Sequence, residues 1–386
     1  MTKLFALVMG VNIIILLLLA CAPQVAPGPA PTTGTPLLAA PVPAPVATVS
    51  TEETAWQKIV EAAKREGLVT IYGGAEFSGD GGRRTIEAFR NEYGIRVDLL
   101  ITGGRQGFEK VKIENQIKQP IADIVTLGLS SQVELSLAGM LNSIWQDLPE
   151  LRNRDVFKVN PMYTPNGDVL NMAVSLAGVL INTKRVNTQD EPRSYLDLLA
   201  PKWKGNMILS DPRSGSGGGF AWFAEMRYYK LLDDDYFRRF ARQEPILWGG
   251  ASSEANKMVG RGEAWLFPYA ETVAVSSIIL EGAPLKLLGM TEGSSLLTDP
   301  ISIIRGAAHP NAAKLFINWL LSRKGQDVYT REQRADSVRK DVPDFVDPRV
   351  RLQPEPQKLL PRTYEVAEAA NRYHKEGIAE SIFGKK

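Results

Sequence analysis

Apolar and polar residues alternate in two rhythms from residue 51 to about residue 341, and each rhythm predicts a different element. The first helix is indicated by apolar residues at helical spacing on one face, namely Trp56, Ile59, Val60 and Ala63. Behind it, short apolar runs predict strands over 68–72, 95–101 and 124–127, separated by helices over 83–93 and 107–118. Strands that alternate with helices predict βαβ units and a mostly parallel sheet covered by helices.

A long extended run over residues 170–182 interrupts this rhythm, and we interpret it as a first crossing into a second lobe. That lobe has its own alternation, with strands predicted over 207–209, 246–248 and 264–267 and helices over 220–232, 234–242 and 253–259. The runs 285–288 and 301–304 predict the return crossing, and Pro310 opens a final helix. We therefore expect an α/β fold of two lobes, each a mostly parallel sheet flanked by helices, joined by a hinge.

These patterns divide the chain into successive parts. The predicted parts are a first lobe over 51–169, a second lobe over 170–288, a return to the first lobe over 289–341 and a C-terminal helical tail over 342–386, with its helix over about 363–372.

The N-terminal segment has a different pattern. Lys3 precedes a run of mostly apolar residues from Leu4 to Leu19, which is shorter than the ~20 residues that span a bilayer. This layout predicts a signal peptide over residues 1–20. Residues 22–50 consist almost wholly of Pro, Ala, Val, Thr and Gly, which predicts an extended linker that buries no core.

The residues Leu18-Leu19-Ala20-Cys21 resemble the lipobox of bacterial lipoproteins. That resemblance implies lipidation of Cys21 and a protein that is exported and membrane-anchored, on the outer side of the cytoplasmic membrane or in the periplasm. The alternative is an ordinary signal peptide followed by a chance cysteine, which leaves an unpaired thiol in an exported protein.

Composition excludes several classes of function. A net charge of +2 offers no basic patch for nucleic acid. Cys21 is the only cysteine, and the only histidines are His309 and His374, far apart in sequence. Zinc sites and catalysis by a Ser-His-Asp or Cys-His group therefore lack the residues they need. Residues 215–220 fail the dinucleotide-binding pattern, because Phe220 stands at the last glycine position. We expect neither an enzyme nor a cofactor.

A glycine- and serine-rich loop is the strongest candidate for ligand binding. Residues 210–218 (SDPRSGSGG) follow a predicted strand and precede a helix. Small residues let backbone N–H groups approach an anion, and the helix N-terminus adds partial positive charge. The serines Ser214 and Ser216, beside Gly215 and Gly217, add hydroxyl donors; the alternative is a glycine turn without a ligand. The segment 249–252 is either a second anion nest or a simple N-cap by Ser252.

Five segments resemble the iron(III)-type substrate-binding proteins of ABC transporters. They are 61–72 (EAAKREGLVTIY), 178–184 (GVLINTK), 197–205 (DLLAPKWKG), 307–316 (AAHPNAAKLF) and 321–326 (LSRKGQ), in the family's order between about Trp56 and Val338. The resemblance implies a type 2 periplasmic-binding-protein fold that captures a ligand without catalysis. It also implies a monomer that closes around a hinge and delivers a small molecule or ion to an ABC permease and ATPase.

The resemblance also implies which residues face the cleft. They follow the strands of the first lobe: Gly73, Gly74 and Glu76 after the first strand, and by analogous position Gly104, Arg105 and Ser130. Ligands of open α/β sheets bind at such carboxyl ends of strands. Arg105 is a candidate partner for an anion, and a solvated surface arginine is the alternative.

Tyr269 is the candidate metal ligand of this chain. The iron-binding members have adjacent tyrosines after the strand that matches residues 264–267, whereas this chain has Pro-Tyr-Ala-Glu over 268–271. The Tyr228-Tyr229 pair lies inside a predicted helix, where packing is the expected role. Tyr269 therefore either binds Fe³⁺ as cargo or contacts an organic ligand.

The predicted function is capture of a small solute, either an anionic or phosphorylated organic compound or ferric iron. A sensing or adhesion lipoprotein that reuses the same fold is the alternative.

Overall fold

The computed structural model describes residues 28, 51–73, 75–77, 79–102, 104–215, 217–250 and 252–385. The predicted signal peptide, Cys21 and almost all of the predicted linker lie outside these residues. Contacts divide the chain into two units, Met1–Thr48 and Val49–Lys386, and every helix and strand below belongs to the second. Among the described residues, no helix is both long enough and apolar enough to cross a bilayer.

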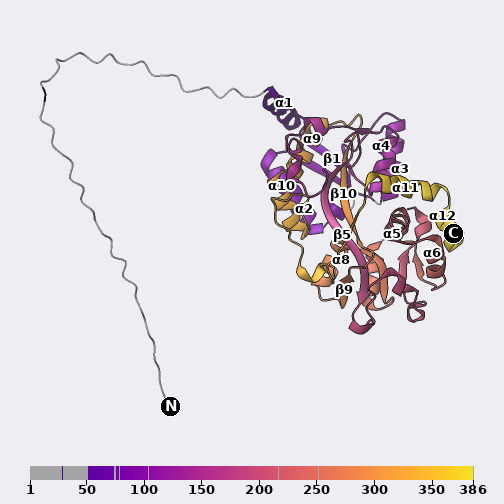
Figure 1. The fold of residues 1–386 in the computed structure, drawn as a ribbon. Coiled ribbons are helices and arrows are strands. Elements are labelled where there is room, and N and C mark those ends of the chain that lie inside the picture. The colour runs from indigo at the N-terminus through magenta and orange to yellow at the C-terminus, as the bar shows by residue number, and fades with distance from the viewer. Residues whose placement is uncertain are drawn as a thin grey trace. The chain divides into compact units, whose positions relative to one another are not determined.

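A nine-stranded sheet connects the two lobes (Figure 1). Its main path is β2 (Arg96–Ile101), β1 (Leu68–Gly73), β3 (Ile124–Thr126), β10 (Ser294–Ile304), β5 (Leu170–Asn182) and β8 (Leu266–Glu271). The strands β1, β2 and β3 are parallel, as the βαβ pattern predicts, whereas β10 and β5 run antiparallel to their neighbours on this path. Three short strands lie beside this path: β4 (Leu141–Asn142) and β11 (Leu359–Pro361) pair with β10, and β9 (Leu285–Leu288) pairs with β5.

The first lobe packs helices against β1, β2 and β3. These helices are α1 (Thr51–Glu66), α2 (Gly79–Tyr93), α3 (Gly104–Gln116), α4 (Leu129–Leu137), α9 (Pro310–Leu321) and α10 (Arg323–Gln333). The apolar face predicted for the first helix packs against this core, with Ala63 fully buried. Phe89 of α2 contacts the rings of Phe316 and Trp319 of α9 at 5.0 and 5.4 Å, so residues far apart in sequence close the same core.

The second lobe has its own aromatic core. It contains the parallel strands β6 (Ile208–Ser210) and β7 (Ile246–Trp248) with the helices α5 (Gly217–Tyr228), α6 (Asp234–Ala241), α7 (Ser252–Arg261) and α8 (Thr272–Leu280). Trp222 of α5 is fully buried and contacts the rings of Phe237 and Phe240 of α6 at 5.3 and 5.1 Å.

Two long strands run between the lobes. β5 spans the residues predicted for the crossing, and it pairs with β10 from Leu170↔Ile301 to Ala177↔Ser295. β10 begins at Ser294, so the return strand is longer than the run over 301–304 predicts, because polar residues such as Asp299 interrupt the apolar signal. The run over 285–288 forms β9, which pairs with the Val179–Asn182 end of β5 and is not itself a crossing strand.

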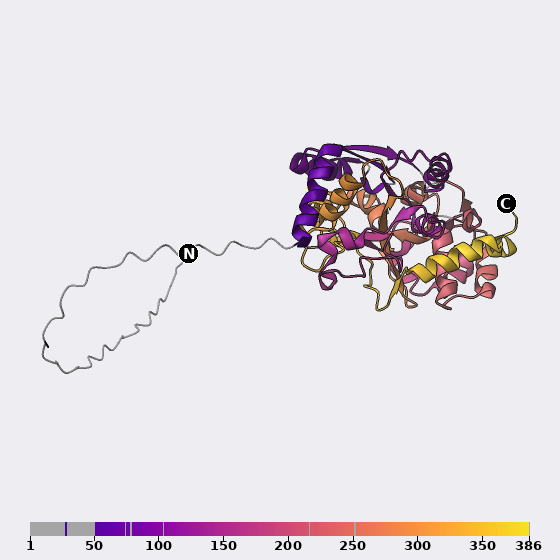
Figure 2. The same cartoon turned by 90° about the horizontal axis from the view of Figure 1, so that it is seen from above.

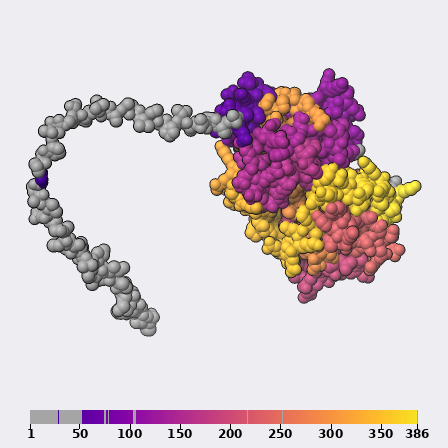
Figure 3. Space-filling view, turned by 45° about the horizontal axis from the view of Figure 1, so that its top comes forward, coloured from indigo at the N-terminus to yellow at the C-terminus, as the bar shows by residue number. Residues whose placement is uncertain are grey.

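The C-terminal segment packs on both lobes. The helix expected over 363–372 is α11 (Tyr364–Lys375), and α12 (Ile378–Phe383) follows it. α11 packs against α4 of the first lobe and α5 of the second, and Figure 3 shows the C-terminal residues in yellow between the two. Figure 2 places these helices on the side of the fold away from α1. The tail therefore lies beside the region where the lobes meet.

Candidate ligand-binding site

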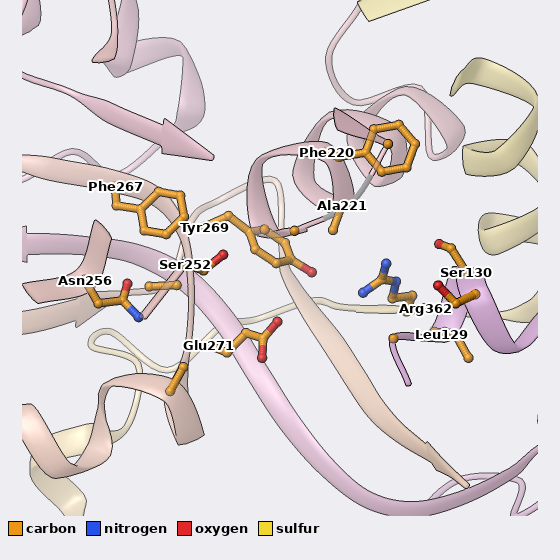
Figure 4. Close-up of a pocket in the computed structure, with 17 residues that line it drawn as sticks. Leu129, Ser130, Phe220, Ala221, Ser252, Asn256, Phe267, Tyr269, Glu271 and Arg362 are labelled. Carbon is orange, nitrogen blue, oxygen red and sulfur yellow. The ribbon is translucent and has the colours of Figure 1, made fainter. Parts of the chain in front are cut away.

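A cavity of about 390 Å³ lies where the two lobes face each other, and we call it the first cavity. Its walls come from residues 128–131 at the start of α4, from the glycine loop before α5, from β8 and from the tail (Figure 4). The side chains that line it include Ser130, Phe220, Ser252, Asn256, Phe267, Tyr269, Glu271 and Arg362. The cavity is thus bounded by both lobes at once.

Four helices of the described chain begin at the walls of the first cavity. They are α4, α5, α7 and α8, and their first-turn or capping residues Ser130, Gly217, Ser252 and Glu271 all line it. Gly128, the N-cap of α4, has no side chain to satisfy the first N–H groups. A helix N-terminus carries roughly half a positive charge and free N–H donors. The backbone therefore makes this cavity favourable for an anion.

The glycine loop brings its backbone close to the strand before it. Gly215 and Gly217 have φ of +69° and +79°, in the left-handed region where glycine is strongly preferred. At Gly219, a Cβ would lie 1.8 Å from the carbonyl oxygen of Ser210, so a side chain there requires α5 to move away from β6. The hydroxyls of Ser210 and Ser252 are 3.1 Å apart and join the end of β6 to the start of α7. These residues fix where the helix N-termini point.

A buried charge network lies behind Tyr269 and Arg362, which line the cavity. The carboxylate of Glu225 on α5 accepts hydrogen bonds from the hydroxyl of Tyr269, at 3.2 and 3.3 Å, and from the hydroxyl of Ser295 on β10. The Nε atom of Arg362 lies 3.4 Å from the same carboxylate, and the Arg362 side chain is 16% exposed. Figure 4 shows Tyr269 and Glu271 on one side and Arg362 entering from the other. Arg362 thus carries a cationic group into the cavity.

Burial sets the protonation of this network. It raises the pKa of Glu225, although the charge of Arg362 acts in the opposite direction. Burial also raises the pKa of Tyr269 well above 10, and the negative charge of Glu225 adds to the effect. A tyrosine in this state is a neutral hydrogen-bond donor over the physiological range.

Two further carboxyl groups near this network influence each other electrostatically. Glu271 lines the cavity, and burial raises its pKa, with Arg362 acting against that change. Burial raises the pKa of Asp299 on β10 to about 7, and the charge of Glu271 adds to it. Because burial raises the pKa of Glu271, the negative charge that this side chain presents to the cavity is lost at a higher pH than for an exposed glutamate.

The structure brings four of the predicted site residues together. Ser130, Gly215, Gly217 and Tyr269 all line the first cavity, although they come from three separate parts of the chain. Ser130 lies in the first turn of α4. Ser214 is exposed and donates its hydroxyl to the carbonyl oxygen of Asp211 at 2.8 Å, outside the residues that line the cavity.

Other predicted residues lie elsewhere or cannot be placed. Gly73 ends β1 beside Thr126, where a Cβ would lie 2.7 Å from the threonine hydroxyl. That hydroxyl is 3.5 Å from the carboxylate of Glu76, and neither Gly73 nor Glu76 lines the first cavity. Gly74, Ser216 and the side chain of Arg105 lie outside what the structure describes.

The sequence alone did not indicate Arg362 or Glu271 as site residues. Arg362 follows β11 in the tail, and only the pairing of β11 with β10 brings it to Glu225. Glu271 follows the candidate Tyr269 by two residues in β8, so its place on the same strand was a signal that could have identified it. The Tyr228-Tyr229 pair does not lie inside a helix as predicted, because α5 ends at Tyr228; the two ring centroids are 5.2 Å apart. Tyr229 donates its hydroxyl to the carbonyl of Pro361.

Histidine, cysteine and carboxylate side chains offer no metal centre in the described residues, because no three of them gather where an ion could bind. Tyr269 is the predicted metal ligand, and its raised pKa opposes the phenolate form that iron(III) binds.

Comparison with known proteins shows the relatives of this chain. Residues 120–353 match the family profile described as bacterial extracellular solute-binding protein. An uncharacterized protein of Haemophilus influenzae is 26% identical over 259 residues, which are 63% of this chain and 70% of that protein.

Solved structures share the fold at low sequence identity. The periplasmic binding protein AfuA of Actinobacillus pleuropneumoniae, with fructose-6-phosphate bound, matches with a TM-score of 0.67 at 20% identity, over 81% of this chain and 98% of its own. Iron-bound HitA of Pseudomonas aeruginosa matches with a TM-score of 0.64 at 18% sequence identity, over 80% of this chain and 98% of its own. A periplasmic thiamin binding protein matches with a TM-score of 0.65 at 17% sequence identity, over 82% of this chain and 96% of its own. These matches confirm the predicted type 2 periplasmic-binding-protein fold.

Proposed function

Because this chain belongs to the family of bacterial extracellular solute-binding proteins, which are not enzymes, we propose that its first cavity captures a small anionic solute for an ABC importer. The observation that carries this proposal is the meeting of four helix N-termini in one cavity that also holds Arg362. Partial positive charges and a guanidinium group around one space favour a phosphate ester or a carboxylate.

The residues proposed to contact the anion come from both lobes. Ser130 offers a hydroxyl and a first-turn N–H group from the first lobe, and Gly215 and Gly217 offer backbone groups from the second. Arg362 supplies the charge, and Tyr269 and Glu271 bind the polar remainder of the solute. Contacts from both lobes stabilise the closed state of a hinged protein. Gly73, Gly74, Glu76, Arg105, Ser214 and Ser216 remain predictions from the sequence.

Delivery and location follow the sequence predictions. We propose that lipid on Cys21 and the linker over 22–50 keep the two lobes near a membrane, where a permease and its ATPase receive the solute. Globomycin, an inhibitor of the peptidase that cleaves lipoproteins, should cause the uncleaved precursor to accumulate in cells; unchanged processing contradicts lipidation of Cys21.

Calorimetry of residues 49–386 tests the ligand class. This unit contains both lobes and their cores. The probes are fructose 6-phosphate, inorganic phosphate, thiamin and ferric citrate. We expect a phosphate-bearing probe to bind and thiamin not to bind. A folded protein that binds thiamin alone contradicts the anionic class, and one that binds none of the four contradicts capture of these solutes.

Ferric iron is the second candidate, because the oxygen atoms of Tyr269 and Glu271 line one cavity. Iron bound by phenolate gives a visible charge-transfer band, which the Tyr269→Phe variant would lose. The raised pKa of Tyr269 predicts no such band at neutral pH.

A further inference from the structure

A second cavity of about 450 Å³ shares Arg362 with the first cavity. Residues 159–165, the two crossing strands β5 and β10, and residues 361–365 of the tail form its walls. Tyr163, Asn171 and Thr298 contribute polar side chains, and the ring of Tyr364 lies 6.5 Å from that of Tyr163. Nothing in the sequence patterns predicts a site here.

Three polar atoms in this wall are buried without a hydrogen-bond partner. They are the hydroxyl of Tyr163, the Oδ1 atom of Asn171 and the Oγ1 atom of Thr298. Tyr163 is 8% exposed and Asn171 is 4% exposed. Buried polar groups without partners are uncommon in folded proteins, since each destabilises the fold. Three of them around one space indicate a site for polar groups from outside the chain.

The orientation of these groups is fixed by contacts outside the cavity. The Nδ2 atom of Asn171 donates to the carbonyl of Asn160 at 2.7 Å, which leaves Oδ1 as the acceptor. Burial raises the pKa of Tyr163, so its hydroxyl remains a donor. A donor, an acceptor and the hydroxyl of Thr298, which is both, match the hydroxyl groups of a polyol.

Arg362 connects this cavity to the first one. Its side chain lines both, and its backbone N–H donates to the carbonyl of Leu296 at 3.0 Å, which fixes the residue beside β10. The positive charge of Arg362 acts against the increase that burial causes in the pKa of Tyr163. The two side chains therefore interact electrostatically. The acid in the second wall, Glu365, is exposed and accepts a hydrogen bond from Thr363 at 2.6 Å.

We propose that the second cavity is a specificity subsite that binds the neutral, hydroxyl-bearing part of a solute whose anionic group lies at Arg362 in the first cavity. This inference rests on the proposed capture of an anion. It assigns the solute to phosphorylated or carboxylated polyols, and it makes Arg362 the residue at which the charged and neutral parts of that solute meet.

Calorimetry with two probes tests the proposal. Fructose 6-phosphate carries both parts of the solute, and inorganic phosphate carries only the anion. The wild-type protein should bind fructose 6-phosphate at least about 10-fold more tightly, since each added hydrogen bond contributes roughly 5- to 10-fold. Tyr163→Phe and Thr298→Val should each weaken the affinity for fructose 6-phosphate roughly 5- to 10-fold, the contribution of one hydrogen bond, and leave the affinity for phosphate unchanged.

Tyr364→Phe is the matched control. It removes a hydroxyl from the same wall, but that hydroxyl donates to Glu368 at 3.1 Å, so the affinities for both probes should stay as in the wild type. The melting temperature of each variant shows whether it is folded. If either Tyr163→Phe or Thr298→Val fails to fold, the other variant alone is sufficient for the test.

Two failures can be told apart. If neither probe binds the wild-type protein, the proposed anion capture is wrong, and with it this inference. If phosphate binds but fructose 6-phosphate binds no more tightly, or if Tyr163→Phe and Thr298→Val leave its affinity unchanged, the second cavity is not a subsite and the anion site still stands.

Discussion

The two cavities are similar in volume, about 390 and 450 Å³, but they are built from different chemistry. In the first, glycines and the N-termini of α4, α5, α7 and α8 line the space together with side chains such as Tyr269 and Arg362. The second is formed by side chains with unpartnered polar atoms on Tyr163, Asn171 and Thr298. Backbone dipoles select for charge, whereas individual side chains select for the positions of hydroxyl groups. Arg362 belongs to both cavities.

The comparison also separates what stabilises the protein from what binds. The pair formed by Arg362 and Glu225 is buried, with side chains 16% and 1% exposed. Such a pair is costly to break, because one partner then remains as an uncompensated charge. The residue that joins the two cavities therefore also joins the tail to the second lobe.

The largest expected effect is on stability, from Arg362→Met. It leaves Glu225 buried without its cation, and we expect a loss of about 3–5 kcal/mol in the free energy of unfolding at about pH 8. The loss should be smaller at about pH 5. The pKa of folded Glu225 already lies above its usual 4.5, and removal of Arg362 raises it further, so protonation relieves the buried charge at low pH. Urea unfolding at both pH values measures this.

The double variant Arg362→Met with Glu225→Gln is the control for that experiment. It removes the charge along with its partner, so much of the lost stability should return at about pH 8. Equal losses in the single and double variants would contradict the role given to the ion pair.

The next effect concerns the backbone that forms the first cavity. Gly219→Ala places a Cβ 1.8 Å from the carbonyl oxygen of Ser210 and forces α5 away from β6. We expect a loss of about 1–3 kcal/mol and weaker phosphate binding. Gly249→Ala is the matched control, because a Cβ there meets nothing within 4 Å. Thermal unfolding and calorimetry of both variants are sufficient, and equal behaviour would refute the close approach.

A moderate effect is expected from Asp299→Asn on the pH dependence of stability. Folded Asp299 has a pKa of about 7 against its usual 3.8, so between these values the folded chain holds a proton that the unfolded chain has lost. The stability of the wild type should therefore fall as the pH rises through this window, by a few kcal/mol. The variant should show a flatter profile in urea unfolding from about pH 4 to about pH 8. An unchanged slope would assign the titration to another group.

The smallest effect separates two serines that the sequence treats alike. The hydroxyl of Ser214 donates to Asp211 and lies outside the cavity wall, whereas Ser130 lines the cavity. Ser214→Ala should change phosphate affinity less than about 2-fold, and Ser130→Ala should weaken it about 5- to 10-fold. The reverse order in calorimetry would place the anion at the Ser214 end of the loop.

The sequence predicted the elements that continuous patterns define. The strand over 170–182 is an uninterrupted run of mostly apolar residues that is buried along nearly its whole length, so pattern and structure coincide. Gly215 and Gly217 were visible as site candidates because a backbone site needs small residues in a local stretch. Both cases depend on neighbouring residues only.

The rest depends on contacts that sequence patterns do not encode. Arg362 reaches the first cavity only because β11 pairs with β10, and the pKa of Asp299 is raised to about 7 only because folding buries it within the electrostatic influence of Glu271. Tyr163, Asn171 and Thr298 come from three separate segments, and no spacing rule relates them.

The most direct test of the central claim is a titration of the backbone amide NMR signals of residues 49–386 with inorganic phosphate. The claim is that one anion is held between the two lobes, at Ser130 of α4 and at Gly215 and Gly217 at the start of α5. We predict that the amide signals of all three residues shift together with a single midpoint. Shifts confined to one lobe, or none at these residues while phosphate binds, would contradict it.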